Sequence, residues 1–334
     1  MGVDVVEAVA GDVFLHRALC YRGAAEFRAA AGKFVRGGQA RAEPVLIALS
    51  PGKVSWLRRE LDGLELNGPD PDGPDPDGQG LHGGSTGVAF TDMTELGRNP
   101  ARIIPAIRSF MDRYPGRRIR CLGEPVWPER SAAELREVAR SEALVNAAFS
   151  GIPASLVCLY DRGSLAASVL DGVGCTHPAL LSQGEARSSS SYLGPAGLPS
   201  GCDRPLDCPP ATAARLTYQR DLRPVRSLVA RLAHSARLPA RRITDLVLAA
   251  SEVAANTLRH TRADGTVHVW YDGNEILCQI TDSGVIADRL AGYRRPADDV
   301  PGGKGLWLVH QLCDLVEVRS STGGTTICLH MRLR

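Results

Sequence analysis

The feature that most constrains the fold is an ordered series of short patterns between residues 241 and 309. The segment 242–260 predicts an amphipathic helix, because its Ile, Leu, Val and Ala residues recur at helical spacing and form one apolar stripe. Glu252 and Asn256 stand four residues apart, so they lie on the same face of that helix, beside the stripe. The sequence therefore predicts a carboxylate and a carboxamide side by side.

Two alternating apolar runs, 266–271 and 275–281, follow that helix and predict a β-hairpin with an Asp-Gly-Asn turn between them. The second run ends in Asp282-Ser-Gly284, which places an acidic side chain at a strand end. A glycine cluster at 302–305 then opens another apolar helix. Helix, hairpin, acidic strand end, glycine cluster and helix thus follow one another in a fixed order.

This order brings together residue types that suit a nucleotide site. The amide oxygen of Asn256 can hold Mg²⁺ while Glu252 takes a proton from an attacking hydroxyl group. Asp282 can accept a hydrogen bond from an adenine amino group. Glycines before a helix let backbone N–H groups approach phosphates, and the helix N-terminus favours their negative charge. Each pattern alone is common on protein surfaces, so it is their order that favours the nucleotide interpretation.

The same order resembles the GHKL ATPase superfamily with its Bergerat fold, and within it the anti-sigma-factor serine/threonine kinases of bacteria. The resemblance covers roughly residues 215–334 and implies an α+β domain with helices on one face of a mixed sheet. It implies ATP and Mg²⁺ as cofactors, with Glu252 as general base and Asn256 as the Mg²⁺ ligand. Further residues are implied to contact the nucleotide: Asp282 and Gly284 at the adenine, and Gly303, Lys304 and Gly305 at the phosphates.

One position departs from the family's adenine motif, D-x-G-x-G, because Val285-Ile286 follows Gly284 and the second glycine is missing. The predicted lid, 285–301, is short and rich in arginine, which fits the anti-sigma kinases better than the histidine kinases. A histidine autokinase is not expected. Only 22 residues separate His234 from Asn256, too few for a phosphoacceptor hairpin followed by the start of an ATPase domain.

The chain of 334 residues is long enough for two domains, and its hydrophobic and charged fractions are those of an ordinary globular protein. The formal net charge of +2 gives no reason to expect a nucleic-acid partner. No signal peptide and no apolar run approaching roughly 18 residues is recognisable, so no membrane association is expected. The nine cysteines are scattered without a C-x-x-C pair, which indicates reduced thiols in a cytoplasmic protein.

The first 172 residues alternate strand and helix patterns, which predicts an α/β domain. Continuous apolar runs at 45–49 and 155–160 suit buried strands of a parallel sheet. The Pro-Gly-Lys at 51–53 is similar to a P-loop, but the full glycine pattern is missing and Val54 replaces the hydroxyl residue. The Gly-Pro-Asp repeats within 67–84 predict a disordered insertion.

Four motifs in this half resemble the MEDS sensory domain: His16-x-x-Leu-x-Tyr21, Glu43-Pro-Val-Leu, Gly97-Arg-Asn-Pro100 and Gly123-Glu-Pro-Val-Trp127. The resemblance implies a ligand-sensing α/β module with a mostly parallel sheet of RecA-like type. The candidate sensory residues are His16 and Tyr21, which would frame a polar pocket, and Glu124 and Trp127 in a loop. The alternatives are a hydrogen-bonded histidine at a strand end, and a packed tryptophan beside a solvated glutamate.

Residues 173–212 are dominated by Gly, Ser and Pro and predict a flexible linker. The expected organisation is therefore a sensory domain at 1–172, this linker, and an ATPase domain at 213–334.

Three functions follow as hypotheses. The first is a kinase that phosphorylates a Ser or Thr of a STAS-type anti-anti-sigma protein and also sequesters a sigma factor, under control of a small-molecule signal at the first domain. The second is a non-catalytic ATP-binding partner-switching module. The third is a sensor whose ATPase domain has decayed. A homodimer is compatible with each of them.

Overall fold

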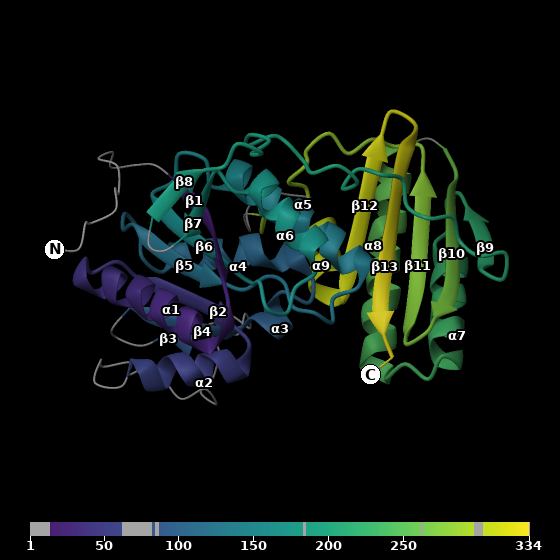
Figure 1. Cartoon of the computed structure of the whole chain (residues 1–334). Helices are drawn as coiled ribbons and strands as arrows, with labels where there is room; N and C mark the ends of the chain where they lie inside the picture. The colour runs from purple at the N-terminus through teal and green to yellow at the C-terminus, as the bar shows by residue number, and fades with distance from the viewer. Residues whose placement is uncertain are drawn as a thin grey trace. The chain divides into compact units, whose positions relative to one another are not determined.

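The computed structural model describes residues 14–61, 82–83, 87–182, 185–261, 263–296 and 303–333. The chain divides into two compact units, Met1–Cys202 and Asp203–Arg334 (Figure 1). No helix within these described ranges is both long enough and apolar enough to cross a lipid bilayer.

The first unit is built on a mostly parallel sheet in the order β3-β4-β2-β5-β6-β1-β7-β8. Neighbouring strands from β4 to β7 run parallel, and only β3 and β8 at the two edges pair antiparallel. The sheet confirms the predicted α/β class. Its described strands are β1 (Leu15–Tyr21), β2 (Val45–Leu49), β3 (His82–Gly83), β4 (Val88–Asp92), β5 (Ile119–Gly123), β6 (Ala154–Asp161), β7 (Ala179–Ser182) and β8 (Glu185–Ser188).

Helices cover both faces of this sheet. Helix α5 begins at the predicted capping box, where the Ser131 side chain accepts a hydrogen bond from the backbone of Glu134 and the Glu134 carboxylate accepts one from the backbone of Ser131. The helical segments are α1 (Gly23–Ala40), α2 (Pro51–Glu60), α3 (Met93–Leu96), the 3₁₀ turn η1 (Pro100–Arg102), α4 (Ile103–Asp112), α5 (Ala132–Ala148) and α6 (Ala167–Thr176).

Hydrophobic side chains pack on both faces of the sheet. Phe27 of α1 and Leu57 of α2 belong to the core that contains Tyr21 of β1. Val138 of α5 and Val173 of α6 belong to a different core, which contains Ala18 of the same strand. Alternate residues of β1 therefore face opposite layers, as strand geometry requires.

Part of the segment predicted as a linker is regular structure. Helix α6 ends at Thr176, β7 pairs with β1, and β8 pairs with β7, so residues up to 188 contribute to the first sheet. The Gly- and Ser-rich composition concealed the short apolar run of β7, which is long enough to add a strand to an existing edge. Most of the predicted insertion, residues 67–81 and 84, lies outside the described residues.

The second unit contains a five-stranded sheet in the order β12-β13-β11-β10-β9. The sequence predicts a mixed sheet, but every described strand pair here is antiparallel. The hairpins β10–β11 and β12–β13 make the pairing within each of these two pairs antiparallel, and β9 also pairs antiparallel with β10. The strands are β9 (Ala214–Tyr218), β10 (Gly265–Asp272), β11 (Glu275–Asp282), β12 (Leu315–Ser321) and β13 (Gly324–Arg332).

Three helices pack with this sheet around one core: α7 (Arg223–Ser235), α8 (Ala240–His260) and α9 (Lys304–Leu312). Helix α8 buries the predicted apolar stripe, including Leu246, Ala250 and Val253, against the strands. Glu252 and Asn256 lie beside this stripe and remain partly exposed. The apolar stripe thus fixes which way these two polar side chains face.

Candidate functional site

The predicted acid–amide pair of α8 lies against the start of α9. A methyl group added at Gly305 would lie 3.0 Å from Glu252 Oε2 and 3.6 Å from Asn256 Nδ2. Gly305 belongs to the first turn of α9, so the absence of a side chain there lets the helix N-terminus approach both polar groups. The structure therefore brings together three predicted residues that are about fifty positions apart in the chain.

Gly303 and Lys304 complete the start of α9. Gly303 is the N-cap and has a φ of +76°, a left-handed backbone conformation that residues other than glycine rarely adopt. The first N–H groups of a helix have no intrahelical acceptor, so they are available to an anion at this end. Gly302, the first glycine of the cluster, lies outside the described residues.

Asp282, at the end of β11, is held by two hydrogen bonds. Thr257 of α8 donates to its Oδ2 at 2.6 Å, and the backbone N–H of Gly284 donates to its Oδ1 at 2.7 Å. Because each carboxylate oxygen has further acceptor capacity, Asp282 can still accept a hydrogen bond from a ligand amino group. Gly284 is confined, since a Cβ there would lie 2.8 Å from Thr261 Cγ2.

Sequence reasoning missed the two residues that support Asp282. Thr257 donates to Asp282, so the hydroxyl of Tyr218, 2.9 Å away, must donate to Thr257. Tyr218 ends β9 and lies over Gly265, where a Cβ would come within 2.3 Å of the tyrosine hydroxyl. One sequence signal could have identified Thr257 as a supporting residue: it directly follows Asn256 and lies on the buried side of α8.

The departure from the glycine motif is accommodated without strain at the backbone. The N–H of Ile286 donates to Ser320 Oγ at 2.8 Å, and its side chain packs against the core of the second unit. Val285 instead points outward, with 58% of its surface exposed. Of the predicted lid, residues 285–296 are described.

The amide oxygen of Asn256 has a partner in the structure. Arg259, one turn later on α8, donates to Asn256 Oδ1 at 2.8 Å. Both side chains reach solvent, so the guanidinium can swing away when a stronger cation competes. The partly exposed oxygen of Asn256 and the space left by Gly305 beside Glu252 fit a nucleotide-bound Mg²⁺, which accepts one or two protein oxygens and keeps water for its other positions.

In the first unit, Tyr21 and Glu124 meet at the carboxyl ends of the strands. The Tyr21 hydroxyl donates to Glu124 Oε1 at 2.6 Å, and Lys53 Nζ lies 2.6 and 2.7 Å from the two carboxylate oxygens. Burial first, and Glu124 second, raise the pKa of Tyr21, so the phenol stays protonated and donates. Ligands of α/β sheets bind at this edge, which keeps Tyr21 and Glu124 as sensory candidates and adds Lys53.

Lys53 is the lysine of the P-loop-like tripeptide. Its ammonium group is bound to Glu124 and to the Tyr21 hydroxyl, at 2.7 Å from the latter. In the structure, Lys53 thus forms an ion pair with a residue of its own unit. This agrees with the sequence, which lacks the glycines and the hydroxyl residue of a phosphate-binding P-loop.

Trp127 belongs to a different contact. The guanidinium of Arg130 lies 3.6 Å from the centre of the Trp127 ring, and the same side chain donates to the carbonyls of Pro125 and Gly97. These contacts agree with a packed tryptophan. The other half of that alternative, a solvated Glu124, is wrong, because this side chain is buried.

His16 does not frame a pocket with Tyr21, as the sequence had predicted. The two residues are five positions apart on one strand, so their side chains point to opposite faces of the sheet. His16 is fully buried on the face of α5, where Asn146, Glu142 and Cys158 surround its ring.

Two family models match the chain. Residues 15–178 match the MEDS domain, the methanogen/methylotroph, DcmR sensory domain. Residues 216–331 match the histidine kinase-like ATPase domain. Among curated proteins, none matches this chain.

One similar solved structure is the crystal structure of the RsbU and RsbW domains of Rv1364c from Mycobacterium tuberculosis. The sequence identity is 21% and the TM-score 0.27, over 36% of this chain and 32% of that chain. This chain thus spans about a third of that protein, and a likeness of this extent carries no argument about activity.

Proposed function

The chain contains an N-terminal MEDS domain and a C-terminal histidine kinase-like ATPase domain, and from this pairing we propose that it is an ATP-dependent serine/threonine protein kinase. Its substrate would be a Ser or Thr of a STAS-type anti-anti-sigma protein, and the kinase would also sequester a sigma factor. The observation that carries the proposal is the approach of Gly305 to Glu252 and Asn256.

Each residue of the site has a distinct task in the proposal. Asp282, fixed by Thr257 and by the backbone of Gly284, would orient the adenine. The N-terminus of α9, with Gly303 and Lys304, would hold the phosphates.

Glu252 would take the proton of the attacking hydroxyl group. No hydrogen bond to its carboxylate is formed by the part of the chain that the structure describes, so its oxygens are available as acceptors. Mg²⁺, held by Asn256 when bound, would neutralise charge on the transferring phosphoryl group.

The first domain would supply the control. Tyr21, Lys53 and Glu124 form a polar cluster at the edge of the sheet where α/β domains bind ligands, and a small-molecule signal there would regulate the ATPase domain. This assignment rests on the MEDS match and on the position of the cluster.

The test uses the full-length protein. Calorimetric titration with ATP and Mg²⁺ measures binding, and transfer of the labelled γ-phosphate to candidate STAS-type proteins measures the activity. The expected result is saturable binding together with one phosphorylated Ser or Thr on a partner. Absence of ATP binding at millimolar concentration would contradict the whole proposal.

A second candidate function is an ATP-binding partner switch without phosphoryl transfer. The hydrogen bond from Arg259 to Asn256 Oδ1 favours it, because the proposed Mg²⁺ ligand is already engaged. If the site is catalytic, Arg259→Ala frees this oxygen. We then expect the apparent affinity for Mg²⁺ in the presence of ATP to rise about threefold, which is the effect of losing one exposed hydrogen bond.

The matched control for that variant is Arg241→Ala, which removes an exposed arginine from the first turn of the same helix. An unchanged Mg²⁺ dependence in Arg259→Ala, together with ATP binding but no transfer to any STAS-type partner, would support the non-catalytic switch.

A further inference from the structure

Four side chains from distant parts of the first unit meet in one buried cluster, which we call the His–Glu–Cys–His cluster. Its members are His16 on β1, Glu142 on α5, Cys158 on β6 and His177 directly after α6. Each offers one nitrogen, oxygen or sulfur atom, and these atoms all lie within 4.8 Å of one another. All four residues are buried.

The hydrogen bonds of Asn146 fix the protonation of His16. Asn146 Nδ2 donates to the carbonyl of Thr176 at 2.8 Å and lies 3.3 Å from those of Glu142 and Ala143. Its Oδ1 therefore faces His16 Nδ1 at 3.1 Å, and Nδ1 must carry the proton. The neutral His16 ring then presents an unprotonated Nε2.

His177 is fixed in the same sense. Its Nδ1 lies 2.9 Å from Thr176 Oγ1 and 2.9 Å from the carbonyl oxygen of Val173. Because the carbonyl can only accept, Nδ1 is assigned as the donor. Its Nε2 makes no well-formed hydrogen bond with the described residues. Both histidines thus turn an Nε2 lone pair towards the interior of the cluster.

These lone pairs face other electron-rich atoms. Glu142 Oε2 lies 3.5 Å from His16 Nε2 and 2.9 Å from His177 Nε2, and the thiol of Cys158 lies 3.4 Å from His16 Nε2. The hydroxyl of Tyr160 donates to the same carboxylate oxygen at 3.3 Å, but the two imidazole lone pairs still face it and are stabilised by a cation between them. That cation is either a proton on the rings or a metal ion.

The geometry favours the metal ion. The two Nε2 atoms, a carboxylate oxygen of Glu142 and the sulfur of Cys158 come together from four separate parts of the first unit, while each Nδ1 faces an outward partner. A metal ion binds unprotonated imidazole nitrogen, carboxylate and thiolate, which are the donor types gathered here.

The donor set and its spacing fit zinc. Two imidazole nitrogens, a thiolate and a carboxylate are zinc ligands, and tetrahedral bonds of about 2.0–2.3 Å place ligand atoms roughly 3.3–3.8 Å apart. The separations of 3.4 and 3.5 Å fall in this range. The shorter 2.9 Å contact has to widen, and any pair near the 4.8 Å limit of the cluster has to close when the ion binds. Both Nδ1 atoms donate outward to a carboxamide or a carbonyl, as zinc-bound histidines do.

We propose that His16, Glu142, Cys158 and His177 bind one Zn²⁺ ion inside the first unit. The site goes beyond the proposed kinase activity, because it lies in the MEDS domain and shares no residue with the nucleotide site.

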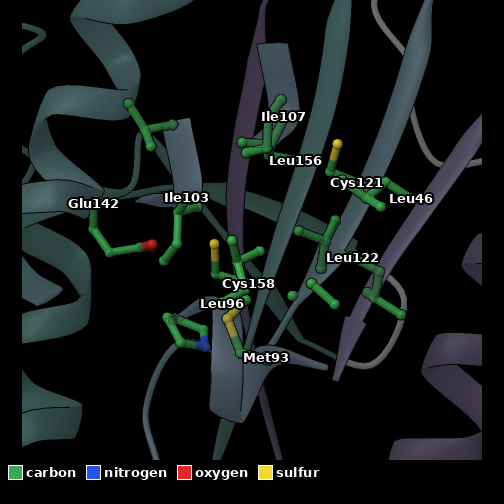
Figure 2. Close-up of a pocket in the computed structure, with 15 residues that line it drawn as sticks. Leu46, Met93, Leu96, Ile103, Ile107, Cys121, Leu122, Glu142, Leu156 and Cys158 are labelled. Atoms are coloured by element: carbon green, nitrogen blue, oxygen red, sulfur yellow. The ribbon is translucent and has the colours of Figure 1, made fainter. Parts of the chain in front are cut away.

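One side of the proposed zinc site faces a small apolar cavity. Glu142 and Cys158 line this cavity of about 30 Å³ together with Met93, Leu96 and Ile103 (Figure 2). Figure 2 shows the carboxylate of Glu142 and the sulfur of Cys158 pointing into the same space. A molecule of only a few atoms fits there.

The test begins with the full-length protein purified under reducing conditions without chelators. Elemental analysis is expected to find about one zinc per chain. Exchange for Co²⁺ should give the intense visible bands of a tetrahedral site and a thiolate-to-cobalt charge-transfer band. Cys158→Ser should abolish the charge-transfer band.

The matched control is Cys121→Ser. Cys121 is a buried thiol on the neighbouring strand β5 and lines the same cavity, but it lies outside the cluster, so this variant should keep the band. His177→Gln provides a second ligand variant, which should lower zinc affinity at least tenfold, in the range seen when a metal site loses a supporting group.

Two results would overturn the proposal. One is wild-type protein that contains no zinc and takes up neither Zn²⁺ nor Co²⁺ when these are added. This measurement does not depend on whether any variant folds. The other is an unchanged charge-transfer band in Cys158→Ser. Neither outcome bears on ATP binding, so the zinc proposal and the kinase proposal fail separately.

Discussion

At the scale of single residues, Glu252 offers the sharpest test of chemistry. Glu252→Gln keeps the shape and the hydrogen-bonding capacity of the side chain but removes its basicity. A general base contributes about 10²- to 10⁴-fold, so phosphorylation of the partner should fall by about two orders of magnitude or more while ATP affinity is retained. Paired measurements of ATP binding and phosphoryl transfer check this.

The control is Asp245→Asn, the same chemical change two turns earlier on α8. It should leave both quantities unchanged. Full transfer activity in Glu252→Gln would remove the base assignment.

His330 predicts how stability depends on pH. Its Nδ1 lies 3.2 Å from Glu275 Oε1 and its Nε2 3.2 Å from Glu317 Oε1, so both nitrogens donate when the ring is charged. Burial lowers the pKa of His330, but Cys328 and the two carboxylates outweigh burial and hold it well above its usual value. The imidazolium is therefore part of the folded state at neutral pH.

Because the folded-state pKa is raised, the stabilisation is complete below the unfolded value near 6.5 and is lost as pH rises through the folded value. Relative to wild type, His330→Gln should lose about 2 kcal/mol at neutral pH and progressively less in alkaline solution. Thermal unfolding of both proteins across this pH range measures the difference. A difference independent of pH would rule out the imidazolium as its source.

At the scale of elements, one hydrogen-bonded chain ties three of them together. Tyr218 of β9, Thr257 of α8 and Asp282 of β11 form it in that order. Thr257→Val keeps the volume but removes the donor that orients Asp282, at a cost of about 1.4 kcal/mol, so ATP affinity should fall about tenfold. Isothermal titration measures it.

Thr244→Val is the matched control, because this exposed threonine donates to the Ala240 carbonyl of its own helix. If both variants bind ATP as wild type does, Asp282 does not depend on Thr257 for its orientation.

The elements also show what could be predicted from the sequence. Helix α8 and the hairpin β10–β11 were predictable because periodicity and turn residues are local signals. The hairpin β7–β8 was missed because a short strand added to an existing sheet edge needs little apolar sequence of its own. The opposite orientations of His16 and Tyr21 followed from strand alternation, whereas the gathering of residues 16, 142, 158 and 177 depends on the packing of four separate elements.

At the scale of the whole molecule, the boundary between the units predicts where a protease cuts. Segment 189–202 is fastened to the first unit: Leu193 N donates to the Cys175 carbonyl, and the buried Cys202 accepts from Arg140 through its carbonyl. Residues 203–212 are mostly exposed and carry no helix or strand. Proteolysis at low enzyme ratio with a broad-specificity protease should therefore cut within 203–212.

Mass spectrometry of the two fragments locates the cut. Early cleavage within 173–188 instead would mean that α6 and the β7–β8 hairpin are not stably part of the first sheet.

The scarcity of lysine has a practical consequence. The sequence holds only three, at 33, 53 and 304, and the structure puts them in three different settings. Lys53 is bound in the polar cluster of the first unit, Lys304 begins α9 at the proposed phosphate site, and Lys33 is exposed on α1. An amine-acylating reagent would thus report on both sites in one experiment, with the exposed Lys33 as the internal standard. When a ligand occupies one site, the extent of acylation would change only in the peptide that carries the lysine of that site.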